Sequence, residues 1–113
     1  MNITRQDQAD VVVLTIDGRV DTNTSIKLSG MLDDIIASDC KKILLDMEAV
    51  DHISSHGLRV ILQGSKNVEE HGGIIVLCSL SVDVSTIFKL SGFSNLLLIY
   101  PNKAMALHEL SGM

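Results

Sequence analysis

The stretch from Ile43 to Leu62 constrains the fold more than any other part of the chain. It begins with a short apolar run, Ile43–Met47, which is typical of a strand buried on both faces of a sheet. A short segment of small and polar residues follows, and from Leu58 onward apolar residues recur at helical spacing. The stretch therefore predicts a strand, a tight turn and a helix, with the hydroxyls of Ser54 and Ser55 where the helix begins.

The same alternation of strand and helix runs along the rest of the chain. We expect strands at Asn2–Arg5, Val11–Ile16, Ile43–Met47, Ile74–Cys78 and Leu96–Tyr100, with a polar turn at Gln6–Asp10. We expect helices at Thr24–Ala37 and Ser55–Glu70, a short one through Val84 and Phe88, and a last one capped by Asn102. This pattern predicts a single α/β domain over residues 1–113, with a mixed, mostly parallel sheet of about five strands, an N-terminal hairpin and about four helices.

Three predicted loops follow strands, and in parallel sheets such loops usually meet at the end where ligands bind. They are Gly18–Asn23, His52–Gly57 and Ser79–Ser81, and we expect them to converge. Asp21 lies in the first of these loops, where a carboxylate also interacts favourably with the dipole of the following helix. Asp46 interrupts an apolar strand, so we expect it to be paired with a cation, hydrogen-bonded or near the open end of that strand, as structural support close to the site.

Ser54 and Ser55 allow two interpretations. Serine is among the best N-cap residues and contributes about 1 kcal/mol to a helix in that role alone. A phosphate on either hydroxyl would instead be held by the unpaired N–H groups and the partial positive charge of the first turn. The spacing of the residues alone favours the capping interpretation.

Composition excludes several classes of protein. The net charge is −5 and aromatic residues make up 3%, which argues against nucleic-acid binding. We find neither an apolar stretch of membrane-spanning length nor a signal peptide, and expect a cytoplasmic protein with Cys40 and Cys78 reduced. The sequence lacks the spacing of a metal site, a phosphate-binding loop, a nucleophile elbow and paired catalytic carboxylates. We therefore predict no catalytic residue, no metal and no cofactor.

Two segments resemble the signature of the STAS domain family, which includes the anti-sigma factor antagonists. Ile53–Arg59 reads Ile-Ser-Ser-His-Gly-Leu-Arg and follows a buried strand, and Gly18–Asp21 gives the Gly-x-x-Asp of the earlier loop. The resemblance implies that Ser55 is the phosphorylation site and that the loop of Asp21 lies beside it. The chain departs from the family pattern at Ser54, where many members have Asp, at His56, where most have a small residue, and at Ser79, near where many have Asn.

The resemblance implies an anti-sigma factor antagonist that works by partner switching. Its partner would be an anti-sigma factor that is also a serine kinase, and binding would free a sigma factor. Phosphorylation of Ser55 would weaken that binding, and a PP2C-type phosphatase would restore it. We expect the partner to contact the loop residues Asp21, Asn23, Thr24, Ser54, Ser55, His56, Gly57, Arg59 and Ser79. Two alternatives remain open: an accessory subunit of a membrane transport ATPase that is not phosphorylated, and a module that binds nucleotides or other small ligands.

Overall fold

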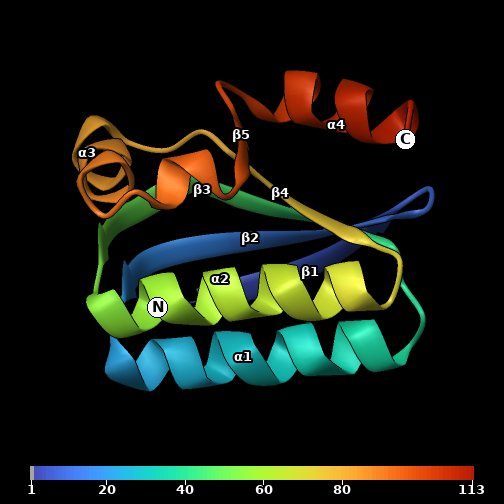
Figure 1. Ribbon diagram of the computed structural model, residues 1–113, viewed down its shortest axis with the longest axis horizontal. Coiled ribbons are helices and arrows are strands. Elements are labelled where there is room, and N and C mark those ends of the chain that lie inside the picture. Colours follow the sequence, from blue (N-terminus) through green and yellow to red (C-terminus); the bar gives the residue numbers. More distant parts are fainter. Residues whose placement is uncertain (1) are drawn as a thin grey trace.

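The computed structural model describes residues 2–113 and shows one sheet covered by helices (Figure 1). The strands are β1 (Asn2–Gln8), β2 (Val11–Val20), β3 (Lys42–Ile53), β4 (Ile74–Cys78) and β5 (Leu98–Tyr100). The helices are α1 (Thr22–Ala37), α2 (Ser55–Glu70), α3 (Val82–Leu90) and α4 (Lys103–Ser111), with a 3₁₀ turn η1 (Phe93–Asn95). The strand order is β1-β2-β3-β4-β5, with β1 antiparallel to β2 and the other neighbours parallel. The predicted fold class is confirmed.

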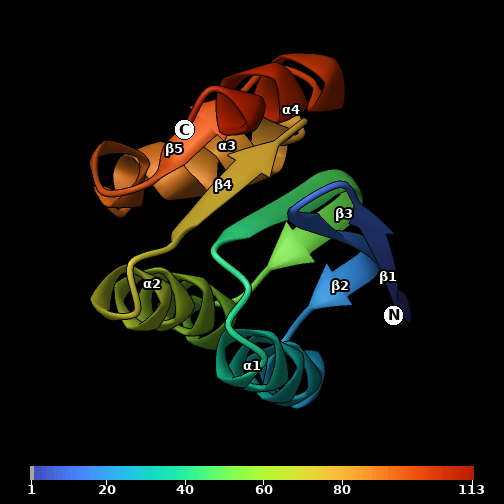
Figure 2. The ribbon, with the colours of Figure 1, turned by 90° about the vertical axis from the view of Figure 1, so that its right-hand side faces the viewer.

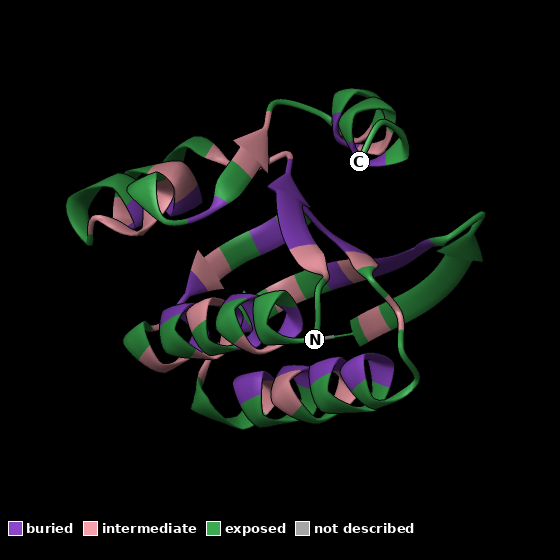
Figure 3. Cartoon of the chain, turned by 45° about the vertical axis from the view of Figure 1, so that its right-hand side comes forward, coloured by how far each residue is buried: buried purple, intermediate pink, exposed green. Residues whose placement is uncertain are grey.

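The alternation of side chains along the strands gives the sheet two apolar faces. Helices α1 and α2 lie side by side against one face, and α4 lies on the opposite side of the sheet (Figures 1 and 2). On α1 and α2 the buried positions line the sides that face the sheet (Figure 3). The larger core contains Leu14, Ile16 and Met47 with residues of α1, α2 and α3, and the smaller core contains Val13, Leu44 and Cys78 with residues of α4.

Strands β2 and β3 are longer than the apolar runs predicted. They pair in parallel up to the pair of Val20 and Ile53, with register shifts after Thr15 and Gly18. The predicted strands stopped at Ile16 and Met47, because polar residues beyond those points break the apolar pattern. Backbone pairing between the two strands continues regardless of that pattern, so both strands reach the first turns of α1 and α2.

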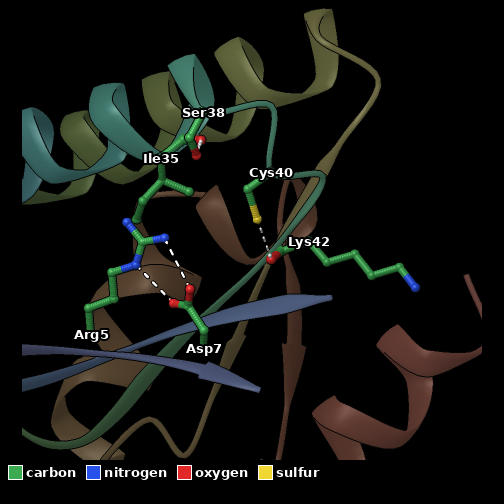
Figure 4. Close-up of polar contacts among 6 residues, drawn as sticks. All are labelled: Arg5, Asp7, Ile35, Ser38, Cys40 and Lys42. Atoms are coloured by element: carbon green, nitrogen blue, oxygen red, sulfur yellow. Dashed lines mark hydrogen bonds and ion pairs between the residues drawn. The ribbon is translucent and has the colours of Figure 1, made fainter. Parts of the chain in front are cut away.

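The N-terminal hairpin is also longer than predicted, since β1 continues to Gln8 and the turn is confined to Ala9 and Asp10. At this sheet edge Arg5 and Asp7 form an ion pair with a nitrogen–oxygen distance of 2.9 Å, and Arg5 holds the pKa of Asp7 below its usual range (Figure 4). Charged side chains on an edge strand discourage pairing with another chain. The expected polar turn at Gln6–Asp10 is therefore partly a polar edge strand.

The C-terminal part follows the prediction with shifted boundaries. Helix α3 begins at Val82 because the side chain of Ser81 caps it, accepting from the backbone N–H of Val84 at 3.2 Å. The chain then forms η1, so that β5 starts at Leu98 and not at Leu96. Asn102 caps α4 as predicted, accepting from the N–H of Met105 at 2.9 Å. Along residues 2–113, every helix is too short or too polar to cross a bilayer.

Candidate protein-interaction site

The start of α2 separates the roles of the two signature serines. Ser54 is the N-cap, and its side-chain oxygen accepts from the backbone N–H of Gly57 at 3.1 Å. The backbone N–H of Ser54 donates to the carbonyl oxygen of Val20 at 2.8 Å, which ties the start of α2 to the end of β2. Ser55 is the first residue of the helix and is exposed, and its hydroxyl has no hydrogen-bond partner among the described residues. The capping role therefore belongs to Ser54, and Ser55 presents its hydroxyl to solvent.

The loop before α1 is held by a capping box. The side chain of Asp21 accepts from the backbone N–H of Thr24 at 3.0 Å, and the hydroxyl oxygen of Thr24 accepts from the N–H of Asp21 at 2.8 Å. The backbone N–H of Thr24 and its hydroxyl, which also lies 3.0 Å from Oδ1 of Asp21, lower the pKa of Asp21, because both stabilise the charged carboxylate. Both side chains are occupied in holding the helix start, and Asn23 between them is exposed.

His56 joins the first turns of α1 and α2. Its Nδ1 lies 2.6 Å from the hydroxyl oxygen of Ser25, a residue with 0% exposure. The hydroxyl of Ser25 also lies 2.9 Å from the carbonyl oxygen of Thr22, which can only accept. Because a hydroxyl has one proton, donation to Thr22 requires Nδ1 of His56 to be the protonated nitrogen that donates to Ser25. The imidazole is therefore turned toward α1 and does not stand beside the hydroxyl of Ser55.

Gly57 is required by the fold itself. A Cβ atom at this position would lie 2.8 Å from Cγ1 of Val20 and 3.0 Å from both Cγ1 of Ile53 and the carbonyl oxygen of Val20. Gly57 is buried, so the close approach that it allows is between α2 and the end of β2. The structure therefore gives Gly57, one of the expected partner contacts, a packing role inside the fold.

The surface around Ser55 continues along α2 toward a groove between α1 and α2. Arg59 is exposed one turn further along α2, and Ile26 on α1 is 62% exposed. A groove of roughly 400 Å³ runs between the helices, and its lining includes His56, Arg59, Ser29 and Asp33. The exposed hydroxyl of Ser55, the arginine one helical turn from it and the groove that this arginine lines form a surface suited to protein binding.

Ser79 does not join this surface, and the predicted convergence of three loops is wrong for the third loop. Strand β4 ends at Cys78, level with Asp46, whereas β3 continues for seven more residues to Ile53. Because an extended strand rises about 3.3 Å per residue, the end of β4 lies about 20 Å short of the end of β3 along the strand direction. Ser79 instead shares a shallow hollow with residues near the start of α4.

Asp46 is buried at the level where β4 ends, and it is hydrogen-bonded, which is one of the arrangements expected from the sequence. Its Oδ1 accepts from the backbone N–H of Glu48 at 3.2 Å, and its exposed fraction is 8%. It supports the strand and lies away from Ser55.

Within residues 2–113, side chains of His, Cys, Asp and Glu do not form any cluster of three or more that could hold a metal ion.

Two residues at the start of α1, one buried beneath this surface and one exposed, were not predicted as part of the site. The sequence indicated Ser25 only as one of several possible caps, and Ile26 only as part of the helix predicted over Thr24–Ala37. The Ser25–His56 hydrogen bond joins residues 31 positions apart, so no local pattern indicates it. The exposure of Ile26 is likewise not predictable from the sequence, since an apolar residue near a helix start is usually assigned to the core.

Comparison with known proteins decides the family. The model of the STAS domain matches residues 2–106. The chain belongs to the STAS domain family. A STAS relative named anti-sigma F factor antagonist, from Paenibacillus polymyxa, is 28% identical over 97% of this chain and 95% of its own length. BtrV of Bordetella bronchiseptica, provisionally assigned as an anti-sigma factor antagonist, is 31% identical over 82% of this chain and 80% of its own length.

Solved structures share the STAS fold at lower identity. A provisionally assigned anti-sigma factor antagonist of Thermotoga maritima has a TM-score of 0.91 at 23% identity, over 96% of this chain and 94% of its own. The Bacillus cell fate determinant SpoIIAA in its phosphorylated form gives 0.76 at 16% identity, over 96% and 98%. A sulfate transporter family protein of Wolinella succinogenes gives 0.82 at 22% identity, over 92% and 87%. These likenesses establish the fold.

Proposed function

We propose that this STAS domain is an anti-sigma factor antagonist controlled by phosphorylation of Ser55. In its unphosphorylated form it binds an anti-sigma factor that is also a serine kinase, and thereby frees a sigma factor in the cytoplasm. The kinase transfers a phosphate to Ser55 and the complex weakens, until a PP2C-type phosphatase removes the phosphate. The domain itself performs no catalysis.

One observation supports this proposal above the others: Ser54 caps helix α2, and Ser55 has no structural role that the described contacts show. Ser54 provides the helix cap, so Ser55 is left exposed, with no structural hydrogen bond that phosphorylation would break. A kinase therefore reaches the hydroxyl without unfolding the helix, and the added phosphate changes the surface by about −1.5 to −2 charges. Two relatives named as anti-sigma factor antagonists match 97% and 82% of the chain, which favours the same role.

The surface around Ser55 suits a switch of this kind. A dianion in a packed interface must lose its hydration, which costs free energy unless new partners replace the water. Every 1.4 kcal/mol lost from the binding free energy weakens the complex tenfold. Asp21 begins the neighbouring helix, and its lowered pKa keeps it negatively charged near neutral pH. An added phosphate therefore increases the negative charge where the partner binds.

The test begins with an affinity tag on this chain, which is used to purify the native partner from a lysate of the host organism. The purified partner is then titrated with three forms of the chain. We expect the wild type and Ser55→Ala to bind the purified partner with similar Kd, and Ser55→Asp to bind at least tenfold more weakly. Incubation with the partner and ATP should add one phosphate, which mass spectrometry locates at Ser55. Equal Kd for Ser55→Ala and Ser55→Asp, or a phosphate that persists in Ser55→Ala, would rule out the switch.

The second candidate is an accessory subunit of a membrane transport ATPase, favoured by the fold shared with a sulfate transporter family protein. In this case the copurified partner would be a transporter subunit, and substitutions at Ser55 would act only through packing. The kinase reaction then separates the two functions, since a transporter subunit would leave Ser55 unmodified.

A third candidate, binding of a nucleotide, predicts an increase in Tm with added nucleotide.

A further inference from the structure

Arg59 lies on the same side of α2 as Ser55, and it is the cation placed to meet a phosphate there. The two residues are four positions apart in one helix and both are exposed. At this spacing the Cβ atoms of two side chains are about 5–6 Å apart, within reach for an ion pair. The guanidinium presents several N–H donors in a planar fork that matches phosphate oxygens.

No acidic side chain in the structure already pairs with Arg59. Along residues 2–113 the ion pairs join Arg5 to Asp7, Lys41 to Asp39 and Lys42 to Asp10. Asp33 lines the groove together with Arg59 but is not within ion-pair distance of it. The guanidinium is therefore available to an anion that is added to Ser55.

The other basic or titratable groups near Ser55 are placed less well. His56 follows Ser55 directly and so points to a different side of the helix, where its Nδ1 contacts Ser25. Arg19 and His52 pair on β2 and β3, one residue before the strands end, and they lie on other elements than Ser55. The carboxylates of this region, Asp21 and Asp51, would repel a phosphate.

We propose that phosphoserine at position 55 is bound by the guanidinium of Arg59 in a helical i to i+4 ion pair. This inference rests on the proposed function. It adds that phosphorylation acts in two ways, because it places an anion on the surface around Ser55 and also withdraws the exposed arginine from the partner. The combined charge of these two side chains changes from about +1 to between about −0.5 and −1.

The test installs phosphoserine at position 55 during translation, so that no kinase is required. Titration followed by ³¹P NMR then gives the second pKa of the phosphate, which is about 6 for phosphoserine. We expect the value in the otherwise wild-type chain to lie roughly half a pH unit below that in Arg59→Gln, because the ion pair favours the dianion. Arg59→Lys keeps the charge and should retain part of the difference.

Two further variants identify the cation responsible. Lys66 lies on α2 about 16 Å further along the helix axis from Ser55, so Lys66→Gln makes the same change of charge at a screened distance and should leave the pKa unchanged. Arg19→Gln removes the nearby arginine of β2 and should also have little effect. The proposal is overturned if Arg59→Gln leaves the phosphate pKa at the wild-type value, or if Lys66→Gln or Arg19→Gln shifts it as much. Since the phosphate is built in, these results do not depend on whether a kinase acts on Ser55 or whether Ser55→Asp weakens partner binding.

Discussion

The hydroxyl oxygen of Ser25 and Nδ1 of His56 lie 2.6 Å apart and join the first turn of α1 to the first turn of α2. Ser25 is buried, and His56 stands between Ser55 and Gly57 of the signature. The bond fixes the relative position of the two helix starts that present Asn23 and Ser55. The imidazole of His56 therefore has a structural contact with α1, although its residue stands next to the exposed serine.

Removal of that bond should destabilise the domain measurably. We expect Ser25→Ala to lower the free energy of unfolding by about 1 kcal/mol, because a hydrogen bond is lost and His56 loses its protein partner. In a His56→Ala background the same substitution should cost less, with a coupling of at least about 0.5 kcal/mol between the two residues. Urea denaturation of the four proteins measures both values. Strictly additive effects would mean that the contact contributes no stability.

The two signature serines should differ in their effects on stability. Ser54→Ala removes the N-cap hydrogen bond to Gly57 and should cost about 1 kcal/mol. Ser55→Ala is the matched control one residue away, and it should change stability by less than about 0.5 kcal/mol because the side chain is exposed. Thermal and urea unfolding at neutral pH compare the two variants. A larger loss in Ser55→Ala would show that the exposed serine has a structural role.

Two glycines in helices should respond to alanine in opposite directions. Gly57→Ala brings a Cβ atom to 2.8 Å from Val20 Cγ1 and 3.0 Å from the Val20 carbonyl oxygen, so we expect a loss of about 1–3 kcal/mol. Gly30 on α1 has no atom within 4 Å of the same position, so Gly30→Ala should stabilise the domain by about 0.5–1 kcal/mol. Urea denaturation gives both changes, and a neutral Gly57→Ala would contradict the tight approach of α2 to β2.

Asp21 should make stability depend on acid pH. Its pKa in the folded chain is lowered, first by the backbone N–H of Thr24 and then by the Thr24 hydroxyl. A carboxylate with a lowered folded-state pKa contributes stability above its unfolded-state pKa of about 3.9. That contribution is lost as the pH falls through the lower, folded-state value. Asp21→Asn can still cap the helix but carries no charge.

Denaturant unfolding of wild type and Asp21→Asn at pH 7 and at pH values below 4 checks this expectation. The wild type should be the more stable protein at pH 7, and the difference between the two should shrink as the pH falls. A difference that stays constant over this range would mean that the charge of Asp21 contributes nothing through its contacts with Thr24.

Local patterns predicted the parts of the fold that local forces decide. The bounds of α2, Ser55–Glu70, were predicted because a serine cap precedes them and His71 with two glycines follows. The bounds of β4, Ile74–Cys78, were predicted because an unbroken apolar run is buried on both faces. The signature from Ile53 to Arg59 was sufficient to indicate the STAS family, which the family match confirms.

The length of a strand, in contrast, depends on its neighbour in the sheet. Strand β3 continues from Met47 to Ile53 because β2 pairs with it up to Val20, although the sequence there is no longer apolar. Strand β4 has β5 as its outer neighbour and ends at Cys78, where the last pairs form. Ser79 is therefore far from Ser55, although both follow a strand of the same parallel sheet.

The sequence by itself determined the order of strands and helices, the family and the turn in which Ser54 and Ser55 stand, because these follow from side-chain periodicity and a contiguous motif. Only the tertiary structure decided that Ser54 is the cap and Ser55 the exposed hydroxyl, that His56 turns to Ser25, and that Gly57 packs on Val20. The cap of Ser54 is a local bond to Gly57, but the start of α2 is placed by the bond from Ser54 to Val20, and the contacts of His56 and Gly57 also join segments separated by 30 or more residues, such as the 31 between Ser25 and His56. Their geometry exists only after the end of β2 and the starts of both helices have been brought together by the sheet.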